Sequence, residues 1–248
     1  MCPLDYYRPE SLEEALALLG QGVPLAGGTR LTPERRDLAG VIDLQDIGLD
    51  TLDLMGSQLS LGATVTLQML VDCEAAPPAL QDAARREAGW NIRNAASLGG
   101  ILHAADGRSH LLTTLAACEV VVQVMPGEET MSLGDYLDFR KGEQAHLVTG
   151  IEVNIPARLK VSYVARSPSD RPILITAAAW YRDTPDSVRL AMGGAGSRPS
   201  CAVVETVEQA SGLATSVYAG AEDAWASAAY RQSAGGTLAV RLFEEVGP

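Results

Sequence analysis

The chain contains very little lysine and few aromatic residues. Of its 248 residues only two are lysines, Lys141 and Lys160, and aromatic residues make up 5%. Acidic residues outnumber basic ones by 31 to 19, which gives a net charge of −12, and no block of like charge occurs. Nucleic-acid and anionic-membrane surfaces need clustered Lys or Arg. The composition therefore argues against both kinds of partner.

Long apolar runs and cysteine clusters are missing as well. No run approaches the roughly 18 apolar residues that cross a bilayer, and the N-terminus lacks the basic-then-apolar pattern of a signal peptide. We therefore expect a cytoplasmic protein without a transmembrane segment. The cysteines are too far apart for a zinc site, an iron–sulfur site or a dense disulfide framework. We expect buried or half-buried free thiols at Cys2, Cys73, Cys118 and Cys201, so any metal chemistry belongs to another chain.

Hydrophobic periodicity predicts an α+β protein of one to two domains. Ser11 and Glu14 stand at capping-box spacing ahead of an apolar stripe that ends at Gly20, which predicts a helix over 12–19. Leucines alternate with polar residues on both sides of Gly56-Ser57, which predicts a hairpin. Further helices are predicted over 66–71, 78–88 and 111–117, and further strands over 23–26, 41–44, 119–125 and 147–155.

The pattern changes at Pro156. Beyond it, strands are predicted over 160–165, 173–181 and 187–192, followed by helical, alanine-rich sequence from about 201 to 246, which is typical of a small α+β domain. Earlier in the chain, residues 89–100 are predicted to be irregular. We expect a first domain over 1–156, with subdomains of about 1–52 and 53–156, and a second domain over 157–248.

Two glycine loops have the chemistry to bind an anion through their backbone: Leu25-Ala26-Gly27-Gly28-Thr29, which follows a predicted strand, and Ser97-Leu98-Gly99-Gly100. Adjacent glycines let amide N–H groups converge without a Cβ in the way, and the hydroxyls of Thr29 and Ser97 each add a hydrogen bond. A dinucleotide diphosphate fits this chemistry, and a tight turn is the alternative for each pair. Neither GxGxxG nor GxxxxGK[ST] occurs, so Rossmann-type binding and P-loop hydrolysis lack their signatures.

Further motifs accompany these loops in a fixed order. The first domain carries Tyr7-Arg8-Pro9, Val41-Ile42-Asp43-Leu44, Leu61-Gly62-Ala63-Thr64-Val65-Thr66 and Ile92-Arg93-Asn94-Ala95-Ala96-Ser97-Leu98-Gly99-Gly100. The second carries Ser169-Asp170-Arg171-Pro172-Ile173, Arg189-Leu190-Ala191-Met192-Gly193-Gly194 and Ala226-Ser227-Ala228-Ala229-Tyr230-Arg231. Over nearly its whole length the chain resembles the FAD-binding (medium) flavoprotein subunit of the molybdenum hydroxylases, the family of xanthine dehydrogenase and aerobic carbon monoxide dehydrogenase.

The resemblance implies a fold and a cofactor. The implied fold is a two-subdomain FAD-binding domain, similar to that of vanillyl-alcohol oxidase, followed by a small C-terminal domain with a short antiparallel sheet and helices. FAD is the implied cofactor, and no residue of this chain is implied to be catalytic or to bind a metal. The implied cofactor-binding residues are Leu25, Ala26, Gly27, Gly28, Thr29, Arg30, Arg93, Ser97, Leu98, Gly99, Gly100, Ile101, Asp106, Leu147 and Tyr163.

The resemblance also implies an activity and partners. In such a complex the medium subunit takes electrons from the [2Fe–2S] clusters of a small subunit and passes them to NAD, a quinone or oxygen. A large subunit with the molybdopterin cofactor oxidises the substrate, and the implied assembly is a dimer of heterotrimers. Two other hypotheses stay open: a scaffold subunit of such a complex that has lost FAD, and an unrelated stand-alone flavin oxidoreductase.

Three departures from the family pattern affect the predicted site. Ile101 stands where the family usually has Asn, and Ile offers no side-chain hydrogen bond. The segment 104–110 is one or two residues short, so Asp106 is a displaced version of the family's acidic contact, or that contact is missing. Tyr163 replaces a common lysine, and its ring could still lie against a flavin.

Several of these residues also have structural interpretations. Arg93 could bond loop carbonyls rather than a phosphate, and Asp106 could cap the helix that follows it. Trp90 could fill the core rather than pack on the cofactor. His103 and His110 could be solvated or structural instead of contacting a flavin or an electron acceptor.

Overall fold

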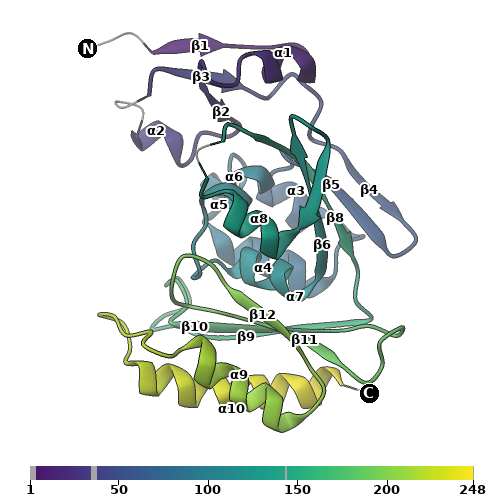
Figure 1. Ribbon diagram of the computed structural model, residues 1–248, viewed down its shortest axis with the longest axis vertical. Coiled ribbons are helices and arrows are strands. Elements are labelled where there is room, and N and C mark those ends of the chain that lie inside the picture. Colours follow the sequence, from purple (N-terminus) through teal and green to yellow (C-terminus); the bar gives the residue numbers. More distant parts are fainter. Residues whose placement is uncertain (1–3, 35–37, 143, 248) are drawn as a thin grey trace. The chain divides into compact units, whose positions relative to one another are not determined.

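The computed structural model describes residues 4–34, 38–142 and 144–247. The chain forms two compact units (Figure 1). Unit 1 comprises Met1–Ala75, Ala88–Ala104 and Val120–Val153, and unit 2 comprises Ala76–Glu87, Ala105–Glu119 and Asn154–Pro248. Two segments that precede Pro156 thus pack with the C-terminal part of the chain, while the domain division expected at that residue stays a prediction.

Unit 1 begins with a small parallel sheet. Its strand order is β1-β3-β2, with bounds Asp5–Tyr7, Gly40–Asp43 and Val23–Leu25. Helix α1 (Leu12–Ala17) starts at Ser11, whose side chain accepts a hydrogen bond from the Glu14 N–H, so the predicted helix start is confirmed. Its residue Ala15 packs on Ile42 of β3 in a small apolar core.

A five-stranded sheet forms the rest of unit 1. Its strand order is β4-β5-β8-β6-β7, with bounds Leu52–Met55, Gln58–Gly62, Leu147–Asn154, Glu119–Met125 and Glu129–Ser132. The predicted hairpin is present as β4 and β5, which pair antiparallel. The helices of this unit are α2 (Leu31–Glu34), α3 (Leu67–Asp72), α5 (Trp90–Arg93), α6 (Leu98–Ala104) and α8 (Leu133–Phe139).

Unit 2 is built on an antiparallel sheet of order β12-β11-β10-β9, with bounds Ser200–Val204, Val188–Gly193, Leu174–Trp180 and Arg158–Val164. Side chains of β10 alternate between two apolar clusters, Leu174 and Ala178 in one and Ala177 and Ala179 in the other. Helices α9 (Val207–Val217) and α10 (Ala228–Val246) cover one face (Figure 1). Helix α7 (His110–Ala117) contributes to the other cluster and packs on α4 (Pro78–Glu87).

Three expectations are wrong in detail. Residues 200–204 form an edge strand rather than helix, because they pair antiparallel with β11 and their valines suit a strand. The stretch 89–100, expected to be irregular, contains α5 and the start of α6. Cys73 and Cys118 are buried free thiols, but Cys201 is exposed on the edge strand, and Cys2 lies outside the described residues. Within the described ranges, no helix combines the length and apolar character needed to cross a membrane.

Candidate functional site

The first glycine loop presents a run of unbonded backbone donors. Residues 26–30 connect β2 to α2, and Gly28 adopts a φ of +66°, a conformation that glycine enters without a Cβ penalty. Among the backbone hydrogen bonds of the described residues, none is donated by the N–H groups of residues 26–30. Consecutive backbone N–H groups in such a turn form a concavity that binds anions. The loop therefore has the donor set that a phosphate needs.

The second glycine loop is bonded differently from the expectation. The N–H groups of Leu98 and Gly99 donate to the carbonyl oxygens of Val65 and Ala63, both at 2.8 Å. The Gly100 N–H donates to Ser97 Oγ at 3.2 Å, and the Ile101 N–H to the Ser97 carbonyl at 3.1 Å. These donors are already used within the protein. These hydrogen bonds are structural, and the first loop is the one of the two whose N–H groups donate no backbone hydrogen bond among the described residues.

The two loops nevertheless lie side by side within unit 1. A Cβ built on Gly27 would stand 1.5 Å from the carbonyl oxygen of Ala95, so only glycine permits this approach. Close by, the Arg30 guanidinium donates to the carbonyl oxygen of Ala104 at 3.3 Å. Residues 25–30 and 95–104 therefore form one wall around the unbonded donors.

Other predicted residues of unit 1 have structural partners. Arg93 donates from Nε to Gln68 Oε1 and from Nη1 to the Ala88 carbonyl, both at 3.1 Å. This is the geometry of the structural alternative, in which Arg93 bonds a loop carbonyl. Leu147 is 3% exposed and packs with the apolar core under α1. Trp90 is 63% exposed, so the expectation that it fills the core is wrong.

A pair of histidines lies near the end of α6. The rings of His103 and His146 are 5.7 Å apart between centroids. His146 Nδ1 donates to the carbonyl oxygen of Gln144 at 3.0 Å, which leaves its buried Nε2 without a partner among the described residues. Burial, together with the neighbouring His146 and Arg140, lowers the pKa of His103. Sequence reasoning singled out His103 but missed its partner, because nothing local links the two positions.

Asp106 and Tyr163 belong to unit 2, apart from the rest of the predicted set in unit 1. The Asp106 carboxylate pairs with Arg171 and accepts the Arg108 N–H at 2.8 Å. Burial disfavours its charge, but these hydrogen bonds outweigh burial and lower the pKa of Asp106. The residue that caps α7 is Ser109, whose Oγ accepts the Leu112 N–H at 2.9 Å, so the expected capping role of Asp106 is wrong.

Tyr163 is held by two neighbours within its own unit. Its hydroxyl is hydrogen-bonded to Arg86, whose guanidinium lies 4.9 Å from the ring centroid. The His110 ring meets it edge-on at 4.8 Å. His110 is 5% exposed, and burial followed by the charge of Arg86 lowers its pKa from 6.5 to about 4. His110 is therefore a neutral, structural histidine, which is one of the two alternatives considered for it.

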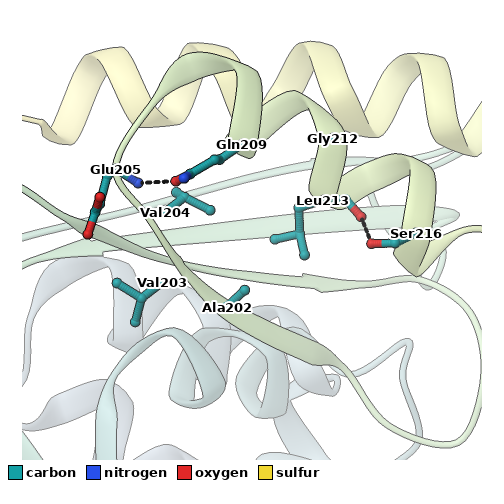
Figure 2. Close-up of a pocket in the computed structure, with 8 residues that line it drawn as sticks. All are labelled: Ala202, Val203, Val204, Glu205, Gln209, Gly212, Leu213 and Ser216. Carbon is teal, nitrogen blue, oxygen red and sulfur yellow. Dashed lines mark hydrogen bonds between the residues drawn. The ribbon is translucent and has the colours of Figure 1, made fainter.

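Neither a metal-ligand cluster nor the hollow beside β12 offers a second site among the described residues. No group of three or more His, Cys, Asp or Glu in the described ranges is arranged to hold a metal ion. Figure 2 shows an open hollow between β12 and α9, with Glu205 and Gln209 at one end. There the Glu205 N–H donates to Gln209 Oε1 at 2.7 Å, as part of the cap of α9. The hollow thus lacks a convergent set of free polar groups.

Comparisons with known proteins identify related sequences. Residues 2–157 match the model of a family described as the FAD binding domain in molybdopterin dehydrogenase. The protein YgfM of Escherichia coli K12 is 33% identical over 201 residues, which cover 78% of this chain and 75% of that protein. The glyceraldehyde dehydrogenase medium chain of Sulfolobus acidocaldarius is 28% identical over 216 residues, covering 79% and 76%.

A solved structure confirms the expected α+β fold. The matching chain of the Cu,Mo-CO dehydrogenase superposes on this chain with a TM-score of 0.84 at 24% identity, covering 99% of both chains. The fold predicted from the sequence, an FAD-binding domain followed by a small domain with an antiparallel sheet and helices, is therefore confirmed.

Proposed function

Because the chain belongs to the family of FAD-binding domains of molybdopterin dehydrogenases, whose cofactor is FAD, we propose that it is the electron-transfer subunit of a molybdopterin-dependent hydroxylase or dehydrogenase. Its electrons come from [2Fe–2S] clusters on a small partner subunit and pass to NAD, a quinone or oxygen. The molybdopterin cofactor and the substrate belong to a large partner subunit. Two relatives named as medium chains, of glyceraldehyde dehydrogenase and carbon monoxide dehydrogenase, support this division of labour.

The proposal extends to assembly and domain organisation. The complex is a dimer of heterotrimers in the cytoplasm. The FAD-binding domain spans 1–156, with subdomains of about 1–52 and 53–156, and residues 157–248 form the C-terminal domain. The range matched by the family model, 2–157, supports the boundary.

The observation that carries the proposal is the run of unbonded N–H groups over residues 26–30. These donors would bind the diphosphate of FAD, with the Thr29 hydroxyl adding another hydrogen bond. Hydrogen bonds to a charged group contribute about 1.5–3 kcal/mol each, so a few of them hold a diphosphate firmly. When bound, FAD supplies the conversion between one-electron and two-electron transfer.

The residues of this chain would position the cofactor rather than take part in bond chemistry. Gly27 brings the first loop against Ala95, and the neighbouring segment 97–101 contributes Ser97 and Ile101 to the same wall. Ile101 offers only apolar contact there. We therefore expect FAD affinity to depend on the backbone of residues 26–30 more than on any single side chain. Tyr163 and Asp106 stay predicted contacts.

The test is the FAD content of the complex purified with its partner subunits, measured by flavin absorption and by mass spectrometry of the native assembly. We expect one FAD per chain in the unchanged protein and strongly reduced occupancy in Gly27→Ala. The matched control is Gly89→Ala, where an added Cβ meets nothing within 4 Å. A complex that assembles fully yet contains no FAD would contradict the proposal and favour the scaffold hypothesis. A chain that oxidises a donor without any partner would favour a stand-alone oxidoreductase.

A further inference from the structure

Unit 2 carries a surface made of two arginines and a tryptophan from three separate segments. The guanidinium groups of Arg108 and Arg166 each lie 4.6 Å from the ring centroid of Trp225. Trp225 itself is 43% exposed. Guanidinium groups at this distance are attracted to the face of an indole ring. We refer to Arg108, Arg166 and Trp225 as the Arg–Trp surface.

A buried arginine fixes the loop that presents Trp225. Arg231 is fully buried, pairs with Asp223 at 2.9 Å and donates to the carbonyl oxygens of Ile173 and Ala226 at 3.1 and 3.2 Å. Asp223 Oδ1 in turn accepts the Trp225 N–H at 2.8 Å. The indole is therefore held in place before any partner arrives. A rigid surface loses less conformational entropy on binding than a mobile one.

The Arg–Trp surface carries positive charge that is not neutralised by an ion pair. The nearby carboxylates Asp106 and Asp223 are paired with Arg171 and Arg231. Among the described residues, neither Arg108 nor Arg166 forms an ion pair with a carboxylate. The surface is thus a cationic patch on a chain whose net charge is −12.

We propose that the Arg–Trp surface docks an acidic segment of a partner protein. Arginine and tryptophan are the residues most enriched among those that dominate binding energy at protein interfaces. An acidic segment is repelled by most of this acidic chain, so an isolated cationic patch also sets where and in which orientation it binds. The inference concerns unit 2 alone and does not depend on FAD binding.

Arg108 already uses part of its hydrogen-bonding capacity within unit 2. Its Nε and Nη2 donate to the carbonyl oxygens of Pro172 and Arg171 at 2.9 and 3.0 Å. Arginine binds a carboxylate or a phosphate most strongly through two parallel N–H groups of one guanidinium, and Arg108 has already committed one such pair. What it still offers is charge, which suits carboxylates spread along a segment.

The experiment titrates the full chain with a hexaglutamate peptide at low ionic strength and follows tryptophan fluorescence. The chain has three tryptophans, and subtraction of the Trp225→Phe variant isolates the signal of Trp225. We expect a saturable change that weakens as salt is added. Arg166→Gln should raise the dissociation constant by about two- to fivefold, the range for one exposed charge pair. Arg182→Gln, on an exposed turn of the same unit, is the matched control and should leave it unchanged.

Three results would overturn the inference. The first is the absence of any saturable Trp225 signal with the peptide. The second is equal affinity in Arg166→Gln and Arg182→Gln. The third is tighter binding of inorganic pyrophosphate than of hexaglutamate, with loss of that binding in Arg166→Gln, because this would make the surface a phosphate site. Arg166 is the decisive position. Its one hydrogen bond among the described residues is a long one of 3.4 Å to the Ala224 carbonyl, so its replacement spares the loop that Arg231 supports.

Discussion

Protonation of His110 should control how the stability of this protein changes with pH. The side chain is 5% exposed, its Nδ1 has no hydrogen-bond partner among the described residues, and its ring packs against Tyr163. Burial is the main cause that lowers its pKa from 6.5 to about 4, and the charges of Arg86 and Arg171 add to it while Asp82 opposes it. His110 therefore takes up a proton at a lower pH in the folded protein than in the unfolded chain.

The sign and size of the effect follow from this difference. The pKa is lower in the folded state, so the contribution of His110 to stability is complete above pH 6.5, is lost as the pH falls, and levels off below pH 4. At about 1.36 kcal/mol per pH unit, the whole loss is about 3.4 kcal/mol. Between pH 7 and pH 5 the expected loss is about 2 kcal/mol.

Urea denaturation from pH 7 to pH 5 measures this effect when the unchanged chain is compared with His110→Leu, which has a similar volume and no titratable group. The difference between the two proteins removes the contribution of every other group that titrates in this range. We expect the free energy of unfolding to fall by about 2 kcal/mol more in the unchanged chain than in the variant. Equal slopes in the two proteins would refute the reasoning, because they would show that His110 accepts its proton as easily folded as unfolded.

Three further predictions concern stability and can be measured by thermal or urea denaturation. Replacing Glu87 by Ala removes the acceptor, at 2.9 Å, of two donors at the start of α7 and should cost about 1–3 kcal/mol, whereas Glu87→Gln keeps an acceptor oxygen and should cost less; equal losses would contradict this. Gly212→Ala, in open space on α9, should stabilise by about 0.5–1 kcal/mol, and Gly235→Ala should destabilise because its Cβ would meet a tyrosine ring at 2.5 Å. Arg231→Met removes the donors to the carbonyl oxygens of Ile173 and Ala226 and should cost about 1–3 kcal/mol, and a loss below 0.5 kcal/mol, roughly the least that a lost hydrogen bond costs, would argue against the role given to Arg231.

Features that depend on neighbours in the sequence were determined by the sequence itself. The capping pair Ser11 and Glu14 marks the start of α1, and alternation around Gly56 marks the β4–β5 hairpin. Both signals act over a few residues, so no distant contact is needed to read them. The ordered motifs likewise identify the family and its cofactor.

Features that depend on residues far apart in the sequence were decided by the tertiary structure alone. The edge strand at 200–204 forms by pairing with β11, and the helical sequence predicted from about 201 begins only at Val207. The N–H groups of Leu98 and Gly99 are unavailable to a cofactor because they donate to the carbonyl oxygens of Val65 and Ala63. The Arg–Trp surface combines side chains from positions 108, 166 and 225, and no local sequence pattern predicts it. For the two amides and for the Arg–Trp surface the deciding partner lies tens of residues away, where only packing of the folded chain can place it.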